Sequence, residues 1–317
     1  MKKLIATFLL LLAACAPPTP APPRDPAATL AATSTAAAIA TPTIETIPLT
    51  ATPAPKASPT AEPVEERVSS VDSMPQVHIP AGTFRMGGMD VRRAPNELPE
   101  HDVTLDGYWM DKLEVTNAMY GLCVSAGECT LPQTLKSQRR PFYFTEPEFK
   151  DYPVIYVTWA QAYTYCQWAG RRLPTEAEWE RAGRGDDFRT FPWGEDKADS
   201  TLANFNMLVG DTSRVGSFQA GASPFGVLDM AGNVAEWVND YYTSSYANAV
   251  TLNPTGPATS ASLNRVVRGG SLGDAEINIR VSKRSSVLGS NLSATTGLLI
   301  SPGDASPRIG FRCAQDE

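Results

Sequence analysis

The sequence has few histidines, no excess of positive charge and no second long apolar run, and each shortage excludes a class of function. Only two histidines, His78 and His101, occur among 317 residues, so a histidine-rich metal site is not available. The formal net charge is −7, which argues against nucleic acid or an anionic lipid surface as a binding partner. Beyond the N-terminus, no apolar stretch approaches the roughly twenty residues of a membrane-spanning helix.

The N-terminus predicts export and lipid attachment. Two lysines precede an apolar run at 4–12, and two alanines follow it, which is the order of a signal peptide with a small-residue cleavage site. The string LAAC at 12–15 resembles the lipobox of bacterial lipoproteins. This resemblance implies that residues 1–14 are removed and that Cys15 carries the lipid. We therefore expect an extracytoplasmic protein that is lipid-anchored to the cell membrane.

The rest of the chain divides into two parts of different composition. Residues 15–75 are dominated by Ala, Pro and Thr and have almost no aromatic side chains, so they cannot bury enough apolar surface to offset the entropy of ordering. We expect this segment to be a disordered tether. All six tryptophans lie within residues 76–317, which are numerous enough to form one well-buried domain.

Three helices are predicted in this domain from their capping residues. Thr116 is the expected N-cap of the first helix. Thr158 with Gln161, and Thr175 with Glu178, have the spacing of capping boxes for the second and third helices. Elsewhere the chain alternates short apolar runs with Gly- and Pro-containing turns. The predicted fold class is therefore α+β with much irregular structure.

The cysteines predict disulfides. If Cys15 carries the lipid, an even number of cysteines remains, and an exported protein is expected to pair them. Cys123 and Cys129 lie on either side of the predicted end of the first helix, which makes a local bridge plausible. Cys166 and Cys313 would then form the second bridge, although counting alone allows other pairings.

An ordered set of sequence strings resembles the sulfatase-modifying-factor family, whose enzymatic members are formylglycine-generating enzymes. The resemblance covers essentially the whole predicted domain. Its strings are IPAGTFRMG at 79–87, EHDVTLDGYWMDKLEVTN at 100–117, YPVIYVTW at 152–159, WAGRRLPTEAEWERAGR at 168–184, FPWG at 191–194, ANF at 203–205, GVLDMAGNVAEWV at 226–238, VVRGGS at 266–271 and IGFRCA at 309–314.

The resemblance implies a fold, a disulfide and a cofactor. The fold is a single C-type-lectin-like domain with little regular secondary structure, and the disulfide joins Cys166 to Cys313. The family also implies structural calcium, which prefers carboxylate, amide and carbonyl oxygens. The expected ligands of the first calcium site are Asp229, Gly232, Val234 and Glu236, and those of the second are Asn204, Phe205, Asp211 and Ser213.

The same resemblance casts doubt on the family's chemistry. Formylglycine formation uses copper held by two cysteines shortly after the GGS string, and thiolates suit copper(I) better than oxygens do. Asp274 and Ile279 occupy these two positions, so copper is not expected. Ser271 is retained, and with Asp274 and Arg280 it forms the candidate pocket. A solvated loop is the preferred interpretation of this segment, because no perturbed environment can be read from the sequence.

Two functional classes remain. The first is a non-catalytic binding module that presents loops at 244–263 and 285–307 to a protein or glycan ligand, with Tyr246 as an anchor. The second is a formylglycine-generating oxidase with an unconventional site. The missing cysteine pair favours the binding module.

Overall fold

The structure is a computed structural model that describes residues 64–292 and 299–317. The predicted signal peptide, Cys15 and most of the predicted tether lie outside these residues, as does part of the loop at 285–307. None of the described helices is long and apolar enough to cross a membrane.

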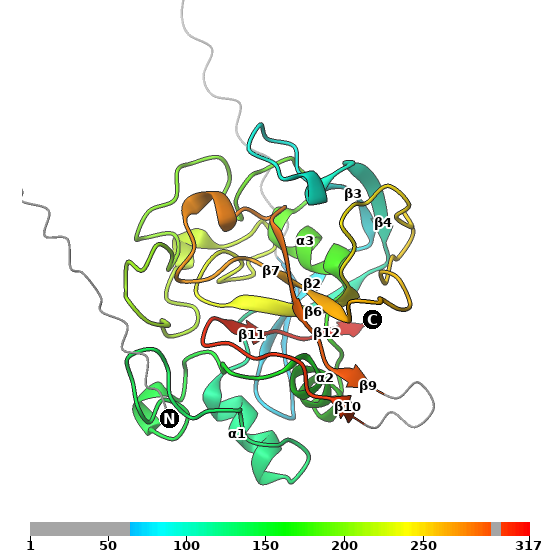
Figure 1. Cartoon of the computed structure of the whole chain (residues 1–317). Helices are drawn as coiled ribbons and strands as arrows, with labels where there is room; N and C mark the ends of the chain where they lie inside the picture. Colours follow the sequence, from blue (N-terminus) through cyan, green and yellow to red (C-terminus); the bar gives the residue numbers. More distant parts are fainter. Residues whose placement is uncertain (1–63, 293–298) are drawn as a thin grey trace, which may run out of the picture. The chain divides into compact units, whose positions relative to one another are not determined.

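Two four-stranded sheets and three short helices form the framework (Figure 1). The first sheet has the order β1-β2-β5-β12 and is antiparallel throughout. The second has the order β11-β6-β7-β8, in which β11 runs parallel to β6 and the other pairs are antiparallel. The strands of the first sheet are β1 (Glu66–Val68), β2 (Pro75–Ile79), β5 (Tyr108–Asp111) and β12 (Ala314–Asp316), and those of the second are β11 (Ile309–Phe311), β6 (Ala235–Tyr241), β7 (Asn264–Arg268) and β8 (Arg284–Leu288).

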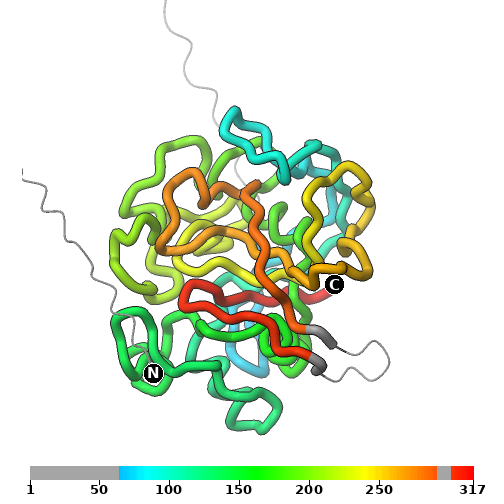
Figure 2. Tube along the Cα trace, viewed as in Figure 1, coloured from blue at the N-terminus to red at the C-terminus, as the bar shows by residue number. Residues whose placement is uncertain are grey.

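Two further strand pairs complete the β-structure. β3 (Gly82–Met86) and β4 (His101–Leu105) pair antiparallel, and β9 (Asn291–Leu292) pairs with β10 (Leu299–Ser301). The connection from residue 185 to residue 234 contains only one short 3-10 helix and forms broad loops in the trace of Figure 2. The predicted α+β class with much irregular structure is confirmed.

The helices begin where their capping residues predict. α1 (Asn117–Ser125) has Thr116 as its N-cap. α2 (Trp159–Trp168) and α3 (Glu176–Arg184) each begin with a complete capping box. Each capping box satisfies backbone N–H groups that have no partner within the helix, so the position of the helix start is fixed locally.

Both predicted disulfides are present. Cys123 is bonded to Cys129 at the end of α1, and Cys166 of α2 is bonded to Cys313, which precedes β12. The second bridge lies in an apolar core that includes Trp237 and Phe311. It links two parts of this core that are far apart in the sequence.

The boundary of the predicted tether needs correction. β1 lies within the segment at 15–75 that was expected to be disordered, and it pairs with β2. Its Arg67 donates a hydrogen bond to Gln76 and lies over the ring of Trp109 at 4.0 Å from the ring centroid. A cation–π contact and a strand ladder therefore order residues whose composition alone did not predict structure.

Candidate functional site

Ser271 and Asp274 form a closed turn at the position expected for the first copper ligand. The Asp274 carboxylate oxygen Oδ2 accepts hydrogen bonds from the Ser271 hydroxyl at 2.7 Å and from the Ser271 backbone N–H at 2.8 Å. The Asp274 N–H donates back to the Ser271 carbonyl at 2.9 Å. Ser271 is 97% buried, and its hydroxyl is thus held by its own turn. No described histidine bonds to it as a general base.

The position expected for the second copper ligand is part of the core. Ile279 is fully buried and packs in an apolar cluster with Phe191 and Ala231. The adjacent Arg280 is also buried, and its guanidinium forms a bidentate pair with the Glu97 carboxylate, with N–O distances of 2.7 and 2.8 Å. The interpretation of this segment as a solvated loop is therefore wrong for Arg280, which neutralises a buried acid rather than lining an open pocket.

Asn204, Asp211 and Ser213 of the second predicted calcium site are brought together around Asn233. The Asn233 side-chain oxygen Oδ1 accepts the Ser213 N–H at 2.8 Å and lies 3.4 Å from Nδ2 of Asn204. Asn204 Nδ2 donates to the Asp211 carbonyl at 2.9 Å. Among the residues that the structure describes, this leaves Asn204 Oδ1 and Ser213 Oγ buried with no hydrogen-bond partner. Phe205 is buried beside them in the chain.

The first predicted calcium site has a different arrangement. The two oxygens of Glu236 accept hydrogen bonds from the Arg312 guanidinium at 2.7 Å each, and Oε2 also accepts the Trp179 indole N–H at 2.8 Å. Glu236 is thus a structural ion-pair partner and does not fit the expected role of calcium ligand. Asp229, by contrast, uses only Oδ2, which accepts the Gly216 N–H, and its Oδ1 is buried without a partner.

Glu114 is a site residue that the sequence analysis missed. Its Oε2 accepts a hydrogen bond from Asn233 Nδ2 at 2.6 Å, and its Oε1 accepts the Val234 N–H at 3.2 Å. Burial, together with the charges of Asp229 and Glu236, raises the pKa of Glu114 well above its ordinary value. Burial also raises the pKa of Asp229 to about 6. Glu114 lies within the EVTN string, but a string does not indicate which of its residues turns inward.

Gly232 brings the two predicted calcium sites into contact. It adopts a positive φ of 81°, and a Cβ at this position would lie only 2.3 Å from the Asn204 carbonyl oxygen. Only glycine allows so close an approach. In consequence the Asn233 N–H reaches the Asn204 carbonyl at 2.8 Å, and Asn204, Asn233 and Glu114 form one oxygen-rich group.

The donor set suits calcium at the second site better than at the first. Among the described residues, no three His, Cys, Asp or Glu side chains are grouped so that they could hold a metal by themselves. A cation would therefore rely on amide, hydroxyl and carbonyl oxygens, which calcium accepts. Within the described part of the chain, Asn204 Oδ1 and Ser213 Oγ provide two such unpartnered oxygens. Both Asp211 carboxylate oxygens, in contrast, already accept hydrogen bonds from Ser137, Arg139 and Thr212.

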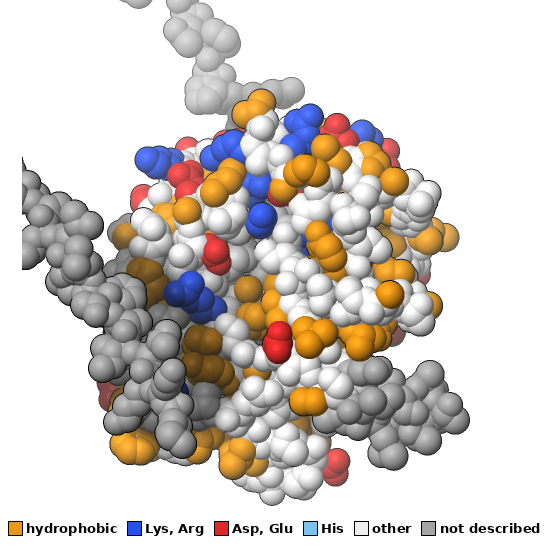
Figure 3. Space-filling model, viewed as in Figure 1, with side chains coloured by type: hydrophobic (Ala, Val, Ile, Leu, Met, Phe, Trp, Pro, Cys, Tyr) orange, Lys and Arg blue, Asp and Glu red, His pale blue; other side chains and the backbone are white. Residues whose placement is uncertain are grey.

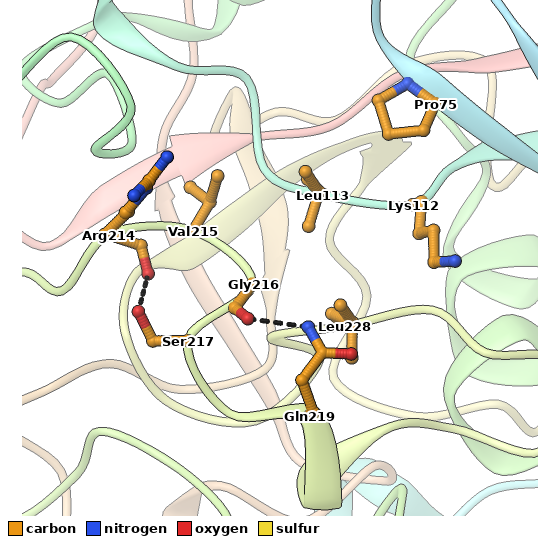
Figure 4. A pocket seen from close by; sticks show the side chains of 9 residues that line it. All are labelled: Pro75, Lys112, Leu113, Arg214, Val215, Gly216, Ser217, Gln219 and Leu228. Carbon is orange, nitrogen blue, oxygen red and sulfur yellow. Dashed lines mark hydrogen bonds between the residues drawn. The ribbon is translucent and has the colours of Figure 1, made fainter.

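A shallow cavity lies close to Asp229 (Figure 4). Its volume is about 530 Å³, and its lining includes Lys112, Arg214 and Gly216. Lys112 forms an ion pair with Glu66 at 2.6 Å, and Arg214 forms one with Asp151 at 2.9 Å. Both cations therefore already have a carboxylate partner among the described residues.

The predicted recognition loop at 244–263 is ordered against β4. Thr104 of β4 donates its N–H to the Thr251 carbonyl at 2.7 Å, and the loop runs beside β3 and β4 in Figure 1. Tyr246, the predicted anchor, is 93% buried, and its hydroxyl donates to Glu176 at 3.1 Å. The expectation that Tyr246 contacts a ligand from the surface is therefore wrong.

Figure 3 shows a face on which Lys, Arg, Asp and Glu gather toward the upper edge.

Comparisons with known proteins agree with this architecture. The sulfatase-modifying factor enzyme 1-like domain matches residues 60–317. The formylglycine-generating enzyme of Streptomyces coelicolor is 31% identical over 76% of this chain and 89% of its own length, and the mouse enzyme is 30% identical over 76% and 74%. The serine/threonine-protein kinase Pkn1 of Chlamydia trachomatis is 33% identical, but this chain spans only 38% of its length.

Solved structures show the same fold. PvdO from Pseudomonas aeruginosa has a TM-score of 0.65 at 27% identity, with 81% of this chain and 99% of that chain covered. Treponema denticola variable protein 1 has a TM-score of 0.59 at 21% identity, with 82% and 100% covered, and this likeness concerns the fold alone. The family match over residues 60–317 and the 31% identity to the Streptomyces coelicolor enzyme show that the chain belongs to the sulfatase-modifying-factor family.

Proposed function

We propose that this domain is a non-catalytic binding module of the sulfatase-modifying-factor family that recognises a protein or glycan ligand. One observation supports the proposal: the two positions where the family has copper-binding cysteines hold residues with structural contacts. Asp274 is folded onto Ser271, and Ile279 is buried in the core. Neither a carboxylate held in its own turn nor a buried alkyl group replaces a thiolate on copper(I).

The proposed module is held outside the cell membrane by a lipid on Cys15 and stabilised by calcium. The anchor rests on the LAAC string at 12–15. The calcium proposal is supported by the oxygens of Asn204 and Ser213, which have no hydrogen-bond partner among the described residues, and the Asp211 carboxylate would have to exchange its present hydrogen bonds to join them. Bound calcium would supply a fixed positive charge that satisfies these oxygens and fixes the connection from residue 203 to residue 213.

The second candidate function is a formylglycine-generating oxidase that converts a sulfatase cysteine to formylglycine. The similarity to the Streptomyces coelicolor enzyme favours it, because 89% of that enzyme's length is matched. Under this alternative Ser271 would contact the substrate, and its release from Asp274 would be required.

A peptide assay separates the two functions. The full-length protein is incubated with copper and a peptide carrying the sulfatase motif, and the aldehyde product is sought by mass spectrometry. The Streptomyces coelicolor enzyme is the positive control. We expect no aldehyde from this protein. Aldehyde that appears with the wild type and disappears with Ser271→Ala would establish the oxidase and overturn the proposal.

The lipid anchor is tested independently of the ligand. The full-length chain and Cys15→Ser are expressed in a bacterial host that is supplied with labelled palmitate. We expect label and membrane sedimentation for the wild type and neither for the variant. Equal labelling of both proteins would remove Cys15 as the attachment point.

A further inference from the structure

A partly enclosed cavity lies between the start of α3, the end of β6 and the loop that follows β6. Its volume is about 440 Å³, which is within the range of sites for small ligands. The lining is largely apolar and includes Met86, Ala177, Val250, Pro254 and Pro257. In Figure 1 the loop that forms one wall lies beside β3 and β4.

Most of the charges that reach this cavity are already paired. The Glu176 carboxylate accepts hydrogen bonds from the Arg284 guanidinium at 2.6 and 2.8 Å. Arg284 also donates to the carbonyls of Asn96 and Thr243. His101 is bonded through Nδ1 to the Pro99 carbonyl. These groups shape the wall, and Glu176 and Arg284 are engaged with each other and with neighbouring carbonyls.

Asp240 is different. It is 95% buried and lines the cavity, yet only its Oδ2 is engaged, accepting the Glu176 N–H at 2.9 Å. Within 64–292 and 299–317, no group donates a hydrogen bond to its Oδ1. Because Asp240 lines the cavity, a ligand held there can offer Oδ1 the hydrogen-bond donor that the described residues do not supply.

We propose that this cavity binds a primary ammonium group carried on a short apolar chain, with Asp240 Oδ1 as the acceptor. An ammonium provides both a donor and the opposite charge, whereas an alcohol provides only a donor. The apolar lining around Val250 and Pro254 would cover the methylene groups. The inference names a ligand class for the proposed binding role and rests on that role. A negative result for ammonium would leave the aldehyde test of the non-catalytic function unaffected.

The protonation of Asp240 gives this binding a characteristic pH dependence. Burial, and then the neighbouring Glu176 charge, raise the pKa of Asp240 to about 8. The charge of Glu178 also raises the pKa of Asp240, whereas the charge of Arg284 of β8 lowers it. An ammonium ligand prefers the ionised carboxylate, so its binding should release a proton below pH 8. Affinity should then rise by roughly tenfold per unit between pH 6 and pH 8.

Calorimetry on the full-length protein tests the inference. The probes are Nα-acetyl-lysine amide, butylammonium and Nα-acetyl-norleucine amide, the last of which lacks the charge. We expect the first probe to bind, and the norleucine probe to bind at least about tenfold more weakly. Binding of butylammonium alone would indicate that the natural ligand is a free small amine. Binding of both amines would indicate that it is a lysine side chain. Equal affinities for the lysine and norleucine probes would overturn the proposal.

Variants separate recognition from folding. Asp240→Asn keeps an acceptor for the Glu176 N–H and should weaken amine binding by at least about tenfold while abolishing the pH dependence. Val250→Trp, at an exposed position in the lining, should block binding without altering the carboxylate. His101→Asn is the matched control, and it should retain the pH dependence. An Asp240→Asn protein that is folded by circular dichroism and binds as tightly as the wild type would contradict the assignment.

Discussion

Two buried polar regions of this domain differ in whether their buried oxygens accept hydrogen bonds. The ion-pair core consists of Glu176, Glu180, Arg184, Arg268 and Arg284. The oxygen cluster consists of Glu114, Asn204, Ser213, Asp229 and Asn233. In the ion-pair core, every carboxylate oxygen accepts a hydrogen bond from a guanidinium. In the oxygen cluster, one oxygen each of Asn204, Ser213 and Asp229 has no hydrogen-bond partner within residues 64–292 and 299–317.

The difference concerns the buried oxygens, because Arg184 Nε and Arg268 Nε of the ion-pair core are themselves buried without an acceptor among the described residues. Arginines from β7 and β8 meet the acids of α3, so the ion-pair core needs no cation from solution. The oxygen cluster has no guanidinium of its own, because Arg312 is engaged by Glu236. A bound cation would interact most favourably with buried oxygens that accept no hydrogen bond.

Removing one member of the ion-pair core should have the largest effect. Arg268→Met leaves the carboxylates of Glu176 and Glu180 partly uncompensated in the interior, which typically costs about 3–5 kcal/mol. Urea unfolding of the purified protein measures this loss. The control is Arg92→Met, whose exposed pair with Asp90 should contribute less than about 1 kcal/mol. Equal losses of unfolding free energy for the two variants would show that the buried ion pairs contribute no more than the exposed pair.

Calcium should stabilise the oxygen cluster and leave the ion-pair core unchanged. At a free concentration one hundred times its dissociation constant, a bound ion adds about 2.7 kcal/mol. For a domain of this size, chelation should then lower Tm by about 5–10 °C. Asn204→Ala should remove the calcium-dependent part of Tm, and Arg268→Met should retain it. An identical Tm in calcium and in chelator would leave the oxygens of Asn204 and Ser213 without this explanation.

Asp240 should make stability depend on pH. Its folded pKa of about 8 lies above the ordinary value of an aspartate, so its contribution is full at low pH and is lost as pH rises. Relative to Asp240→Asn, the wild type should therefore lose about 2 kcal/mol of unfolding free energy between pH 6 and pH 8. Urea titrations of both proteins at each pH measure the difference. A constant difference would show that Asp240 is already ionised at pH 6.

The Ser271 turn should respond least. Ser271→Ala removes one side-chain hydrogen bond to Asp274, while the backbone N–H still reaches the same carboxylate. The expected loss is about 1 kcal/mol. Thermal unfolding of the variant measures it. A much larger loss would mean that the turn shares the energetics of the ion-pair core.

The parts of the fold that depend on local sequence were predictable. The three helix starts and the Cys123–Cys129 bridge follow from residues within a few positions of each other. The Cys166–Cys313 bridge was expected from the family resemblance, and the structure confirms it. Local sequence did not reveal β1, since its stability comes from pairing with β2 and from contact with Trp109.

The candidate site was less predictable, because burial there depends on distant partners. Arg280 was expected near solvent, yet it pairs with Glu97, which lies 183 positions earlier in the chain. Tyr246 was expected at the surface, yet it packs against α3 through Glu176. Glu236 was expected to bind calcium, yet its carboxylate accepts hydrogen bonds from Arg312. A short motif specifies residue types, and only the fold decides which partner each one meets.

The Cys166–Cys313 bridge has a mechanical consequence. A force transmitted along the chain from residues before 64 enters the domain at β1, a three-residue strand at the edge of its sheet. Pulling would detach β1 first and could then extend the chain as far as Cys166. When the opposing force acts at the C-terminus, the covalent link passes the load directly from Cys166 to Cys313, so the loop of residues 167–312 is shielded from tension. The ion-pair core lies within that shielded loop, as does Asp240, whereas Met86 and His101, which also line the cavity, lie outside it.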